Sequence, residues 1–446
     1  MPPLYHLSPR VVPANQTSVI TIRGLFPHTD FRRLKGSLAI DAIAADGLLL
    51  DGRLPGITMG NGYDLQRPNF TPLEGDLDAA TGTLRVKLFF RGEGEHSIRV
   101  LSDGKPVAIF HLYSLNEDFL GLRPFRGDMH LHSHFSGCNH DHASPEYFAA
   151  ASCAKGLDFI SISDHKQLAP SHLAMAFADK CGGRLRAYPG EEVHLHDLHN
   201  LHFLNFGGRE CVSAFLKQNP EQFAAEIAPF YRDFPDDGSD ERVRQLCVSC
   251  DYLLHKINEF SGLSVLCHPY WKPHERFFLP TPVLEYMGRK LNFDALELLG
   301  LGNIAEIHRE MNQLSISFWH DICVRAGRPV PVVGNTDAHG CEGIGLNCSI
   351  VFAAANTLEG IITAVRSNRS VAVERVPGEF PAAFGDRRLV AFAYYLRREY
   401  FPAHDDICRA QGALMFDAIT TGAVNHEAMA ALNSKMKQLD NDFWQA

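Results

Sequence analysis

The feature that most constrains the fold is a change of pattern near residue 126, after which short apolar runs alternate with helix-compatible segments. We predict strands over residues 156–163, 263–267, 295–298 and 330–334. We predict a helix over 145–155, with Ser144 as its N-cap and Pro145 at its first position. This alternation implies a parallel sheet, and the length of the region suits a closed β/α barrel better than a small open sheet.

The chain before about residue 120 has a different pattern, in which short β-type runs alternate with turns. The runs are residues 18–24, 36–43, 83–91, 97–101 and 107–113. Asp103-Gly104, between the last two runs, is a strong signal for a hairpin turn. The period-2 alternation predicts a small antiparallel sandwich of immunoglobulin-like type. The alternative is an irregular extension that lies over the second domain.

Three parts follow from these patterns. We expect a β-sandwich domain over 1–120, a β/α barrel over 121–375 and a helical extension over 376–446 that packs on the barrel. The stretch from about 209 to 260 has a helical pattern with an acidic break, and we expect it to be an insertion that caps an active site. The length of 446 residues agrees with more than one domain, since a single domain spans roughly 100–200.

Charge and cysteine content exclude some classes of function. The chain has 42 Lys and Arg against 52 Asp and Glu, so no basic face for long nucleic acids is expected. No run approaches 18 apolar residues, and the start has no charged and then apolar leader, so we expect a cytoplasmic protein without a membrane partner. The 11 dispersed cysteines indicate reduced thiols, and Cys247 and Cys250 are expected to pack a helix.

Histidines are concentrated in one part of the chain. Residues 1–120 hold four of the 23, whereas residues 128–202 hold eleven. Among these, His130 and His132 are two residues apart in an apolar-alternating segment. On a strand such residues point to the same side, so both imidazoles can reach one cation about 2 Å from each nitrogen.

Further histidines and carboxylates follow other predicted strands at the point where each strand ends. They are Asp164-His165, Gly190-Glu191-Glu192 with the later His202, His268-Pro269, and Asp337-Ala338-His339. In β/α barrels the carboxyl ends of the strands form the face on which sites assemble. Imidazole and carboxylate ligands without a thiolate pair suit zinc, manganese or iron. The sequence therefore predicts a metal site.

The order of these motifs resembles the PHP superfamily, named for polymerase and histidinol phosphatase domains, over roughly residues 126–370. The leading β-domain, the Gly127-Asp128 pair and the helical tail look more like its carbaryl-hydrolase (CehA/McbA-like) branch. The resemblance implies an α/β fold with a distorted (β/α)7 barrel and two or three divalent metal ions. Carried over by motif, His130, His132, Glu192 and Asp337 would hold one ion.

By the same resemblance, Glu192 would bridge to a second ion held by His202 and His268. His165 and His339 would belong to a third ion, together with a carboxylate that the family usually supplies shortly after the first motif. The chain departs from the family there, because the expected Asp position is not occupied directly. Asp141 is the nearest acid, with His140 and His142 as rivals.

Several neighbours of these motifs receive other roles. Glu191 is expected on the opposite side of the strand from Glu192, and Asp164 is expected to orient His165 or to bind metal through water. We interpret Ser133 and Ser163 as local hydrogen bonders, since no base is placed to activate them. A solvated loop is the expectation for the remaining histidines before residue 202, which are His194, His196 and His199.

A metal-bridging hydroxide would make the protein a phosphoesterase that acts on a small, anionic molecule. Asp164 or His339 would then pass a proton to the leaving group, and Lys166, Arg126 and Lys272 are candidates for holding the phosphate. One alternative is a carboxylic or carbamic ester hydrolase with the same metal centre. Another is a non-catalytic metal-binding scaffold with a ligand-binding β-domain. A DNA exonuclease is disfavoured by the acidic charge.

Overall fold

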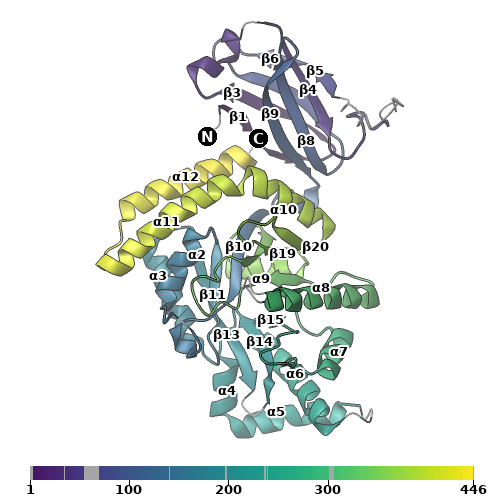
Figure 1. Ribbon diagram of the computed structural model, residues 1–446, viewed down its shortest axis with the longest axis vertical. Coiled ribbons are helices and arrows are strands. Elements are labelled where there is room, and N and C mark those ends of the chain that lie inside the picture. The colour runs from purple at the N-terminus through teal and green to yellow at the C-terminus, as the bar shows by residue number, and fades with distance from the viewer. Residues whose placement is uncertain are drawn as a thin grey trace. The chain divides into compact units, whose positions relative to one another are not determined.

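The computed structural model describes residues 4–34, 36–54, 70–139, 141–195, 198–235, 238, 240–300 and 306–444, without the side chains of 198–200 and 306. The chain forms two compact units (Figure 1). The first comprises Met1–Leu122, Tyr394–His404 and Ser434–Ala446, and the second comprises Arg123–Ala393 and Asp405–Asn433. Each unit is described by itself below.

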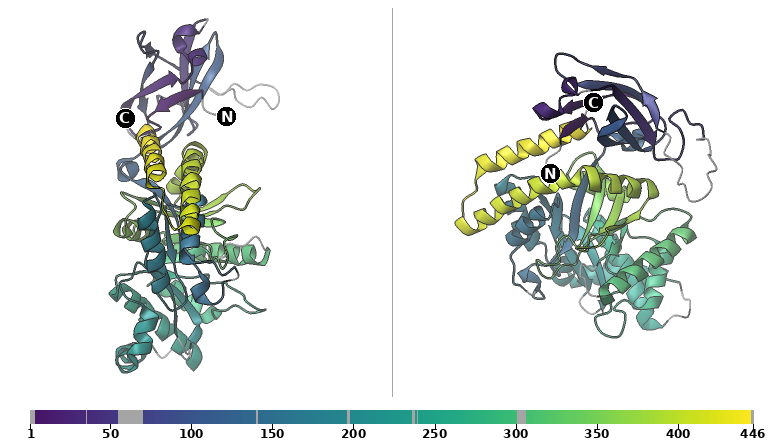
Figure 2. Two further views of the ribbon diagram at one scale, coloured as in Figure 1. Left: turned by 90° about the vertical axis from the view of Figure 1, so that its left-hand side faces the viewer. Right: turned by 45° about the horizontal axis from the view of Figure 1, so that its top comes forward.

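The first unit contains two β-sheets, drawn in purple and blue in Figures 1 and 2. One has the strand order β1-β3-β7-β6 and the other has the order β2-β9-β8-β4-β5. The strands are β1 (Tyr5–Ser8), β2 (Val11–Pro13), β3 (Gln16–Gly24), β4 (Leu38–Ala44), β5 (Thr71–Leu73), β6 (Gly75–Leu77), β7 (Leu84–Phe90), β8 (Gly94–Ser102) and β9 (Lys105–Leu115). Short helical turns are η1 (Pro27–Thr29), η2 (Phe31–Arg33) and α1 (Glu117–Leu120).

Alternation of apolar and polar residues explains how these strands pack. Along β7 every second residue, from Leu84 to Phe90, is buried, as one half-buried face requires. Side chains of β3 and β7 share one apolar core with those of β4, β8 and β9, so the sheets pack on each other. The predicted hairpin joins β8 to β9, and both Asp103 and Gly104 have positive φ (48° and 74°), as a type I′ turn requires.

The second unit also contains two sheets and has most of the helices. One sheet has the strand order β12-β11-β10-β18-β19-β20 and the other has the order β13-β14-β15-β16-β17. The strands are β10 (Arg123–Leu131), β11 (Phe159–Ile162), β12 (Arg186–Tyr188), β13 (Gly190–Leu195), β14 (Leu198–Phe206), β15 (Leu263–Leu266), β16 (Ala295–Leu299), β17 (Val332–Gly334), β18 (Asn347–Ala353), β19 (Ser370–Glu374) and β20 (Ala382–Gly385).

Helices connect most of these strands. They are η3 (His134–Ser136), α2 (Pro145–Ala154), α3 (Ala169–Cys181), α4 (Val212–Gln218), α5 (Pro220–Asp233), α6 (Glu241–Glu259), α7 (Thr281–Lys290), α8 (Glu306–Ala326) and α9 (Leu358–Arg366). The predicted start of α2 is confirmed, because the Ser144 side chain accepts a hydrogen bond from the Tyr147 N–H. The predicted helical stretch forms α4, α5 and α6, which gather at one end of the unit (Figure 1).

The sheet pairing differs in part from the prediction of a parallel sheet. β10–β11–β12 and β15–β16–β17 are parallel, as the β/α alternation predicted. In contrast, β13–β14–β15 and β10–β18–β19–β20 are antiparallel. The fold is therefore mixed α/β. β14 follows β13 through a short hairpin, whereas β18 pairs with β10 from a distant part of the chain, and neither pairing shows as β/α alternation in the sequence.

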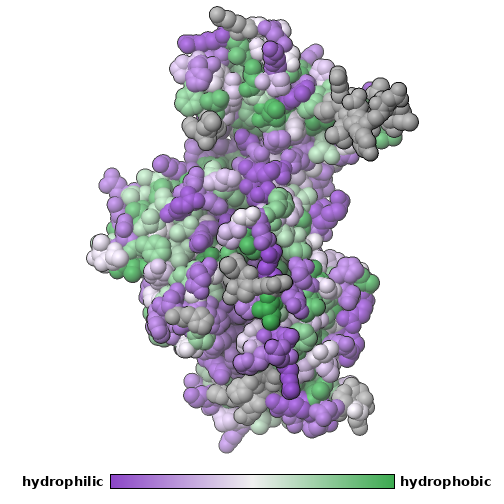
Figure 3. All heavy atoms as spheres, viewed as in Figure 1, coloured by the Kyte–Doolittle hydropathy of each residue, from purple (hydrophilic) through white to green (hydrophobic). Residues whose placement is uncertain are grey.

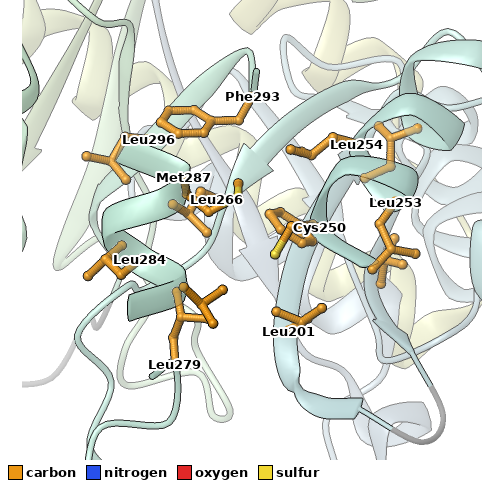
Figure 4. Packing of buried hydrophobic residues seen from close by; sticks show 14 of the residues in the cluster. Leu201, Cys250, Leu253, Leu254, Leu266, Leu279, Leu284, Met287, Phe293 and Leu296 are labelled. Atoms are coloured by element: carbon orange, nitrogen blue, oxygen red, sulfur yellow. The ribbon is translucent and has the colours of Figure 1, made fainter. Parts of the chain in front are cut away.

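The two sheets of the second unit enclose one apolar core and approach each other at their carboxyl ends. Phe125, Met129 and Phe159 of one sheet share this core with Val265 and Val333 of the other. Isolated parallel bridges join Leu131 to Ala338 and His165 to Glu192. A second core lies between the helices α6 and α7 and the strands β14, β15 and β16 (Figure 4). Cys247 and Cys250 are buried in this second core, as expected for helix packing.

The C-terminal tail is helical, as predicted, and consists of α10 (Arg387–Glu399), α11 (Phe401–Thr421) and α12 (His426–Trp444). It is not one extension of the second unit, however. Tyr394–His404 and Ser434–Ala446 belong to the first unit, whereas Asp405–Asn433 belongs to the second. A single segment was predicted because the helical pattern of the tail does not show which unit each helix joins.

On the face shown in Figure 3, hydrophilic side chains are interspersed with hydrophobic ones, which is ordinary for a protein surface. None of the described helices is both long and apolar enough to cross a membrane.

Candidate metal centre

His130 lies at the end of β10 and His132 follows that strand directly, and both side chains are fully buried. Because the two residues lie on the same side of the strand, their rings are neighbours, with centroids 5.0 Å apart. Leu131, between them, forms a parallel bridge with Ala338, and the His132 N–H donates to the Ala338 carbonyl at 3.0 Å. This pairing brings the residues on both sides of Ala338, Asp337 and His339, to the end of β10.

Asp337 has a positive φ of 50°, a backbone conformation that Asp tolerates better than most residues. Its Oδ1 lies 3.2 Å from His130 Nε2 and 2.9 Å from His132 Nε2. Burial alone would raise the pKa of Asp337, but the surrounding histidines outweigh it and hold this pKa well below its usual range. Asp337 is therefore a carboxylate that faces two imidazole nitrogens.

Glu192 on β13 lies at the centre of the site, with each carboxylate oxygen facing a different group of histidines. Its Oε2 is 2.7 Å from His165 Nδ1 and 3.4 Å from His194 Nε2. Its Oε1 is 2.7 Å from His202 Nδ1 and 3.2 Å from His268 Nε2. The same Oε2 is 3.6 Å from His130 Nε2. Each carboxylate oxygen of Glu192 thus faces imidazole nitrogens that could share a divalent ion with it.

Many polar atoms of this cluster are buried and have no hydrogen-bond partner. Such atoms are rare in native proteins, because each costs about 1–3 kcal/mol of desolvation. Their convergence is what a set of metal ligands requires, since imidazole and carboxylate lone pairs must all point at the ion. The atoms are His130 Nε2, His132 Nε2, His165 Nδ1, Glu192 Oε2, His194 Nε2 and Asp337 Oδ1. The residues present therefore fit divalent metal ions.

Cys138 also belongs to the cluster, and sequence reasoning missed it. Ligand atoms of Cys138, His132, His165 and His339 all lie within 4.8 Å of one another, and Cys138 Sγ is 3.3 Å from His165 Nε2. Burial tends to raise the pKa of Cys138, but hydrogen bonds from His165 and His339 outweigh it and lower this pKa to about 7. A signal was present in the sequence, because Cys138 lies between His132 and Asp141, in the stretch where a further ligand was expected.

The structure corrects the expectation for Asp141. Its side chain is exposed, and its oxygens accept backbone N–H groups of Cys341 (2.8 Å) and Ala143 (3.3 Å) instead of joining the cluster. His142 is exposed too, and His140 lies outside the described residues. Asp141 lies three residues further along the loop than Cys138, which is the residue that faces His165.

The expectation of a solvated loop for His194 is wrong. Its side chain is buried, and its Nε2 faces Glu192. The pair His194 and His202 lies opposite in the β13–β14 hairpin with stacked rings 3.9 Å apart, which explains why both histidines reach one carboxylate. His196 lies outside the described residues, as does the side chain of His199.

The other acidic neighbours hold the backbone. Glu191 faces away from the cluster, as expected, and accepts the Val212 N–H at the start of α4. Asp164 accepts the Ser133 N–H at 2.7 Å and bonds the hydroxyls of Ser133 and Ser136. The oxygens of Asp164 thus hold the turn after β10, and its expected roles in proton transfer and metal binding stay predictions. Ser133 is a local hydrogen bonder, as expected.

Glu297 is a further residue that the sequence reasoning missed. This fully buried carboxylate of β16 lies 2.9 Å from His130 Nδ1 and accepts the His268 N–H at 2.8 Å. A carboxylate beside the second ring nitrogen fixes the tautomer of a ligating histidine. Its signal in the sequence is a glutamate inside the apolar run Ala295–Leu299.

We expect Glu297→Gln to weaken metal binding about 10- to 100-fold, because the His130 ring loses its anionic partner. Competition with a chromophoric chelator measures this affinity. Asp294→Asn is the matched control: this carboxylate lies just before β16 and instead accepts the Ser264 N–H and pairs with Arg366. An equal loss of affinity in both variants would contradict a specific role for Glu297.

The basic residues named from the sequence are not gathered around the cluster. Arg126 is buried and pairs with Asp405, so our expectation that it holds a phosphate is corrected. Lys272 is 3.9 Å from Glu275. Lys166 follows His165 directly in the sequence. Burial lowers the pKa of His194, and the positive charge of Lys166 lowers that pKa further. Of the three, Lys166 remains next to the site.

A cavity of about 360 Å³ opens on the cluster. His165, Glu192 and Asp337 line it, together with the rings of Trp271 and Phe278, which form an apolar wall. A larger groove of about 740 Å³ lies beside His194 and is lined by α4, α5 and α6. The predicted insertion thus borders the site through this groove.

No protein-family model and no curated protein sequence matches this chain. Among solved structures, one similar chain is a two-domain protein from Bacteroides vulgatus that contains a predicted PHP-like metal-dependent phosphoesterase (15% identity, TM-score 0.37). The match covers 56% of this chain and 65% of that one, so this chain spans less than two thirds of it.

A second similar structure, from Bifidobacterium adolescentis, is described, likewise as a prediction, as a metal-dependent phosphoesterase (18% identity, TM-score 0.31, covering 49% of this chain and 88% of that one). A third is an amidohydrolase from Chromobacterium violaceum with bound sulfate and no metal (15% identity, TM-score 0.31, covering 49% and 89%). None of the three reaches a TM-score of 0.5, so none assigns this chain to a family or an activity.

Proposed function

We propose that this protein is a metal-dependent hydrolase of the PHP type that cleaves a phosphoester of a small, anionic molecule. In this proposal the second unit is a distorted (β/α)7 barrel of the carbaryl-hydrolase (CehA/McbA-like) branch, and the first unit is an immunoglobulin-like sandwich. The protein would work in the cytoplasm, with two or three zinc, manganese or iron ions and without nucleic-acid or membrane partners.

The observation that carries the proposal is the position of Glu192 between two sets of imidazoles. His130, His132 and Asp337 lie on one side, and His202 and His268 lie on the other. A carboxylate with ligands on both sides suits a pair of ions about 3.5–4 Å apart. When bound, such a pair supplies a hydroxide at neutral pH and neutralises charge on the oxygens of the substrate.

The residues of the chain have separate tasks around this pair. The Nδ1 atoms of His130 and His132 face Glu297 and the Ser136 hydroxyl, both at 2.9 Å, which directs each Nε2 into the cluster. Trp271 and Phe278 cover one side of the cavity and exclude water from the reacting groups. His339 lines the cavity, with its Nδ1 held by the Asp337 carbonyl at 2.7 Å.

A carboxylic or carbamic ester is the second candidate substrate class. Within the described part of the chain, the lining of the cavity contains no Lys or Arg, whereas it contains the indole of Trp271 and the ring of Phe278. A phosphate would then be neutralised by the ions alone, whereas an aryl ester would bury its ring against this wall. The two candidates differ in the group that is attacked, phosphorus or a carbonyl carbon, so a comparison of substrates separates them.

The test is a comparison of metal-loaded protein on an aryl phosphomonoester, an aryl phosphodiester and an aryl carbamate. The proposal expects the highest kcat/KM on one of the phosphoesters. Turnover of the carbamate alone would support the second candidate. Inactivity on all three would support a non-catalytic scaffold. His132→Ala protein prepared in parallel controls for contaminating hydrolases.

A further inference from the structure

We propose that Cys138 supplies a thiolate ligand to a third metal position, together with His165 and His339, and that this position selects a thiophilic ion such as zinc. The proposal rests on the proposed function in one respect, since the same cavity holds the other ions. The ligands of the third metal position are nevertheless separate from those of the other ions, and a thiolate among them changes which kind of ion the protein can retain. Manganese and magnesium prefer oxygen ligands, whereas thiolate favours zinc.

The geometry suits one small ion. Cys138 Sγ lies 3.3 Å from His165 Nε2, and the ligand atoms of Cys138, His165 and His339 fit within 4.8 Å together with His132. Tetrahedral zinc, with bonds of about 2.0 Å to nitrogen and 2.3 Å to sulfur, holds such ligands roughly 3.5 Å apart. His132 Nε2, which is fully buried and has no hydrogen-bond partner, marks the inner edge of this group.

One ring nitrogen of each histidine is placed for this ion. His339 Nδ1 lies 2.7 Å from the Asp337 carbonyl oxygen, and an acceptor there favours the single proton of a neutral imidazole on Nδ1. The lone pair of His339 is then on Nε2, which is the arrangement of a metal-ligating histidine with its outer partner. In His165, Nε2 is the nitrogen that faces Cys138.

The local backbone directs Cys138 into the cavity. The turn η3 ends at Gly137, whose φ of 75° lies in the left-handed region that glycine adopts without strain. The next residue, Cys138, is half-buried and lines the cavity beside His165 and His339. Since His132 Nε2 also lies 2.9 Å from Asp337 Oδ1, we assign His132 to the first ion. Three protein ligands then leave one coordination position open to the cavity.

Cobalt(II) substitution tests the proposal without any enzyme assay. Metal-free, full-length protein titrated with cobalt is expected to develop the near-ultraviolet charge-transfer absorption of a cobalt–thiolate bond. Cys138→Ser should abolish this absorption and lower the bound metal by one ion per chain. Cys138→Asp should restore the ion without the absorption, because a carboxylate binds there without sulfur. Cys267→Ser is the matched control, since Cys267 is the other thiol grouped with the histidines.

Persistence of the absorption in Cys138→Ser and its loss in Cys267→Ser would overturn the proposal. A second measurement uses the unmodified protein, so that it does not depend on the folding of a variant. Zinc should slow alkylation of Cys138 by iodoacetamide at least about tenfold, because a coordinated thiolate is not free to react. Cys323, a half-exposed free thiol of α8, should react equally with and without zinc. Equal alkylation of Cys138 in both states would also overturn the proposal.

The two proposals fail in different ways. If the protein shows the cobalt–thiolate absorption but hydrolyses no ester, the third metal position is supported and the proposed function is refuted. If the protein hydrolyses esters and Cys138→Ser has an unchanged metal content, the proposed function is supported and the thiolate ligand is refuted.

Discussion

Glu192→Gln is expected to lower kcat at least about a thousandfold. The bridging carboxylate would be replaced by a neutral amide, which weakens the hold on both ions at once. Stabilisation of developing charge by metal ions is worth several kcal/mol, and about 1.4 kcal/mol corresponds to a factor of ten in rate. We also expect the variant to retain fewer metal ions per chain than the wild type, as measured by elemental analysis after gel filtration.

Glu191→Gln is the matched control for this variant. Glu191 precedes Glu192 in β13, is equally buried and faces the start of α4 instead of the cluster. A neutral amide can still accept the Val212 N–H, so metal content and kcat should stay close to those of the wild type, while thermal stability falls slightly. If Glu191→Gln lost its metal and Glu192→Gln kept it, the assignment of the bridging ligand would be reversed.

Removal of metal is the second prediction with a large effect. Protein dialysed against a strong chelator should lose hydrolysis altogether and regain it when zinc or manganese is restored. Because the ions bind the folded chain, saturation at a thousand times Kd stabilises it by about 4 kcal/mol. At about 2–4 °C per kcal/mol, we expect Tm to fall by roughly 8–16 °C on chelation. Differential scanning calorimetry measures the shift.

Two outcomes would contradict this prediction. Chelated protein that keeps full activity would exclude metal-dependent hydrolysis, and an unchanged Tm would exclude ions that bridge these strands. Acidification provides an independent check, because protons compete with a metal ion for the imidazole nitrogens. Burial alone would lower the pKa of both histidines, but Glu192 raises the pKa of His165 to about 10 and Asp337 raises that of His339 to about 9. Metal affinity should therefore decrease as the pH falls through about 10 to 9, even without chelator.

The ligand motifs were predictable because they depend on local geometry. His130 and His132 share a side of β10 through the two-residue period of a strand, and the carboxyl ends of parallel strands converge. The residues that were missed depend on pairing between segments far apart in the sequence. Glu297 is 167 residues from His130, and Cys138 is 27 residues from His165. Nothing in the local pattern states which of these segments will be neighbours.

The same reason explains the errors. Arg126 lies close to the first motif in the sequence but is buried against Asp405, 279 residues away. The antiparallel direction of β18 could not be predicted, because a buried apolar run has the same pattern in either direction. His194 became part of the cluster because the hairpin register sets it opposite His202. Register is decided by both strands together, not by either alone.

The neighbouring carboxylates of β13 have one more consequence. Glu191 holds the first turn of α4, and Glu192 lies among the histidines, so a single planar peptide unit separates a helix anchor from the central ligand. A displacement of α4 that drags Glu191 must therefore also displace Glu192. A molecule that wedges into the groove lined by α4 and α6 would, by this route, change the position of Glu192 among the histidines of the cluster.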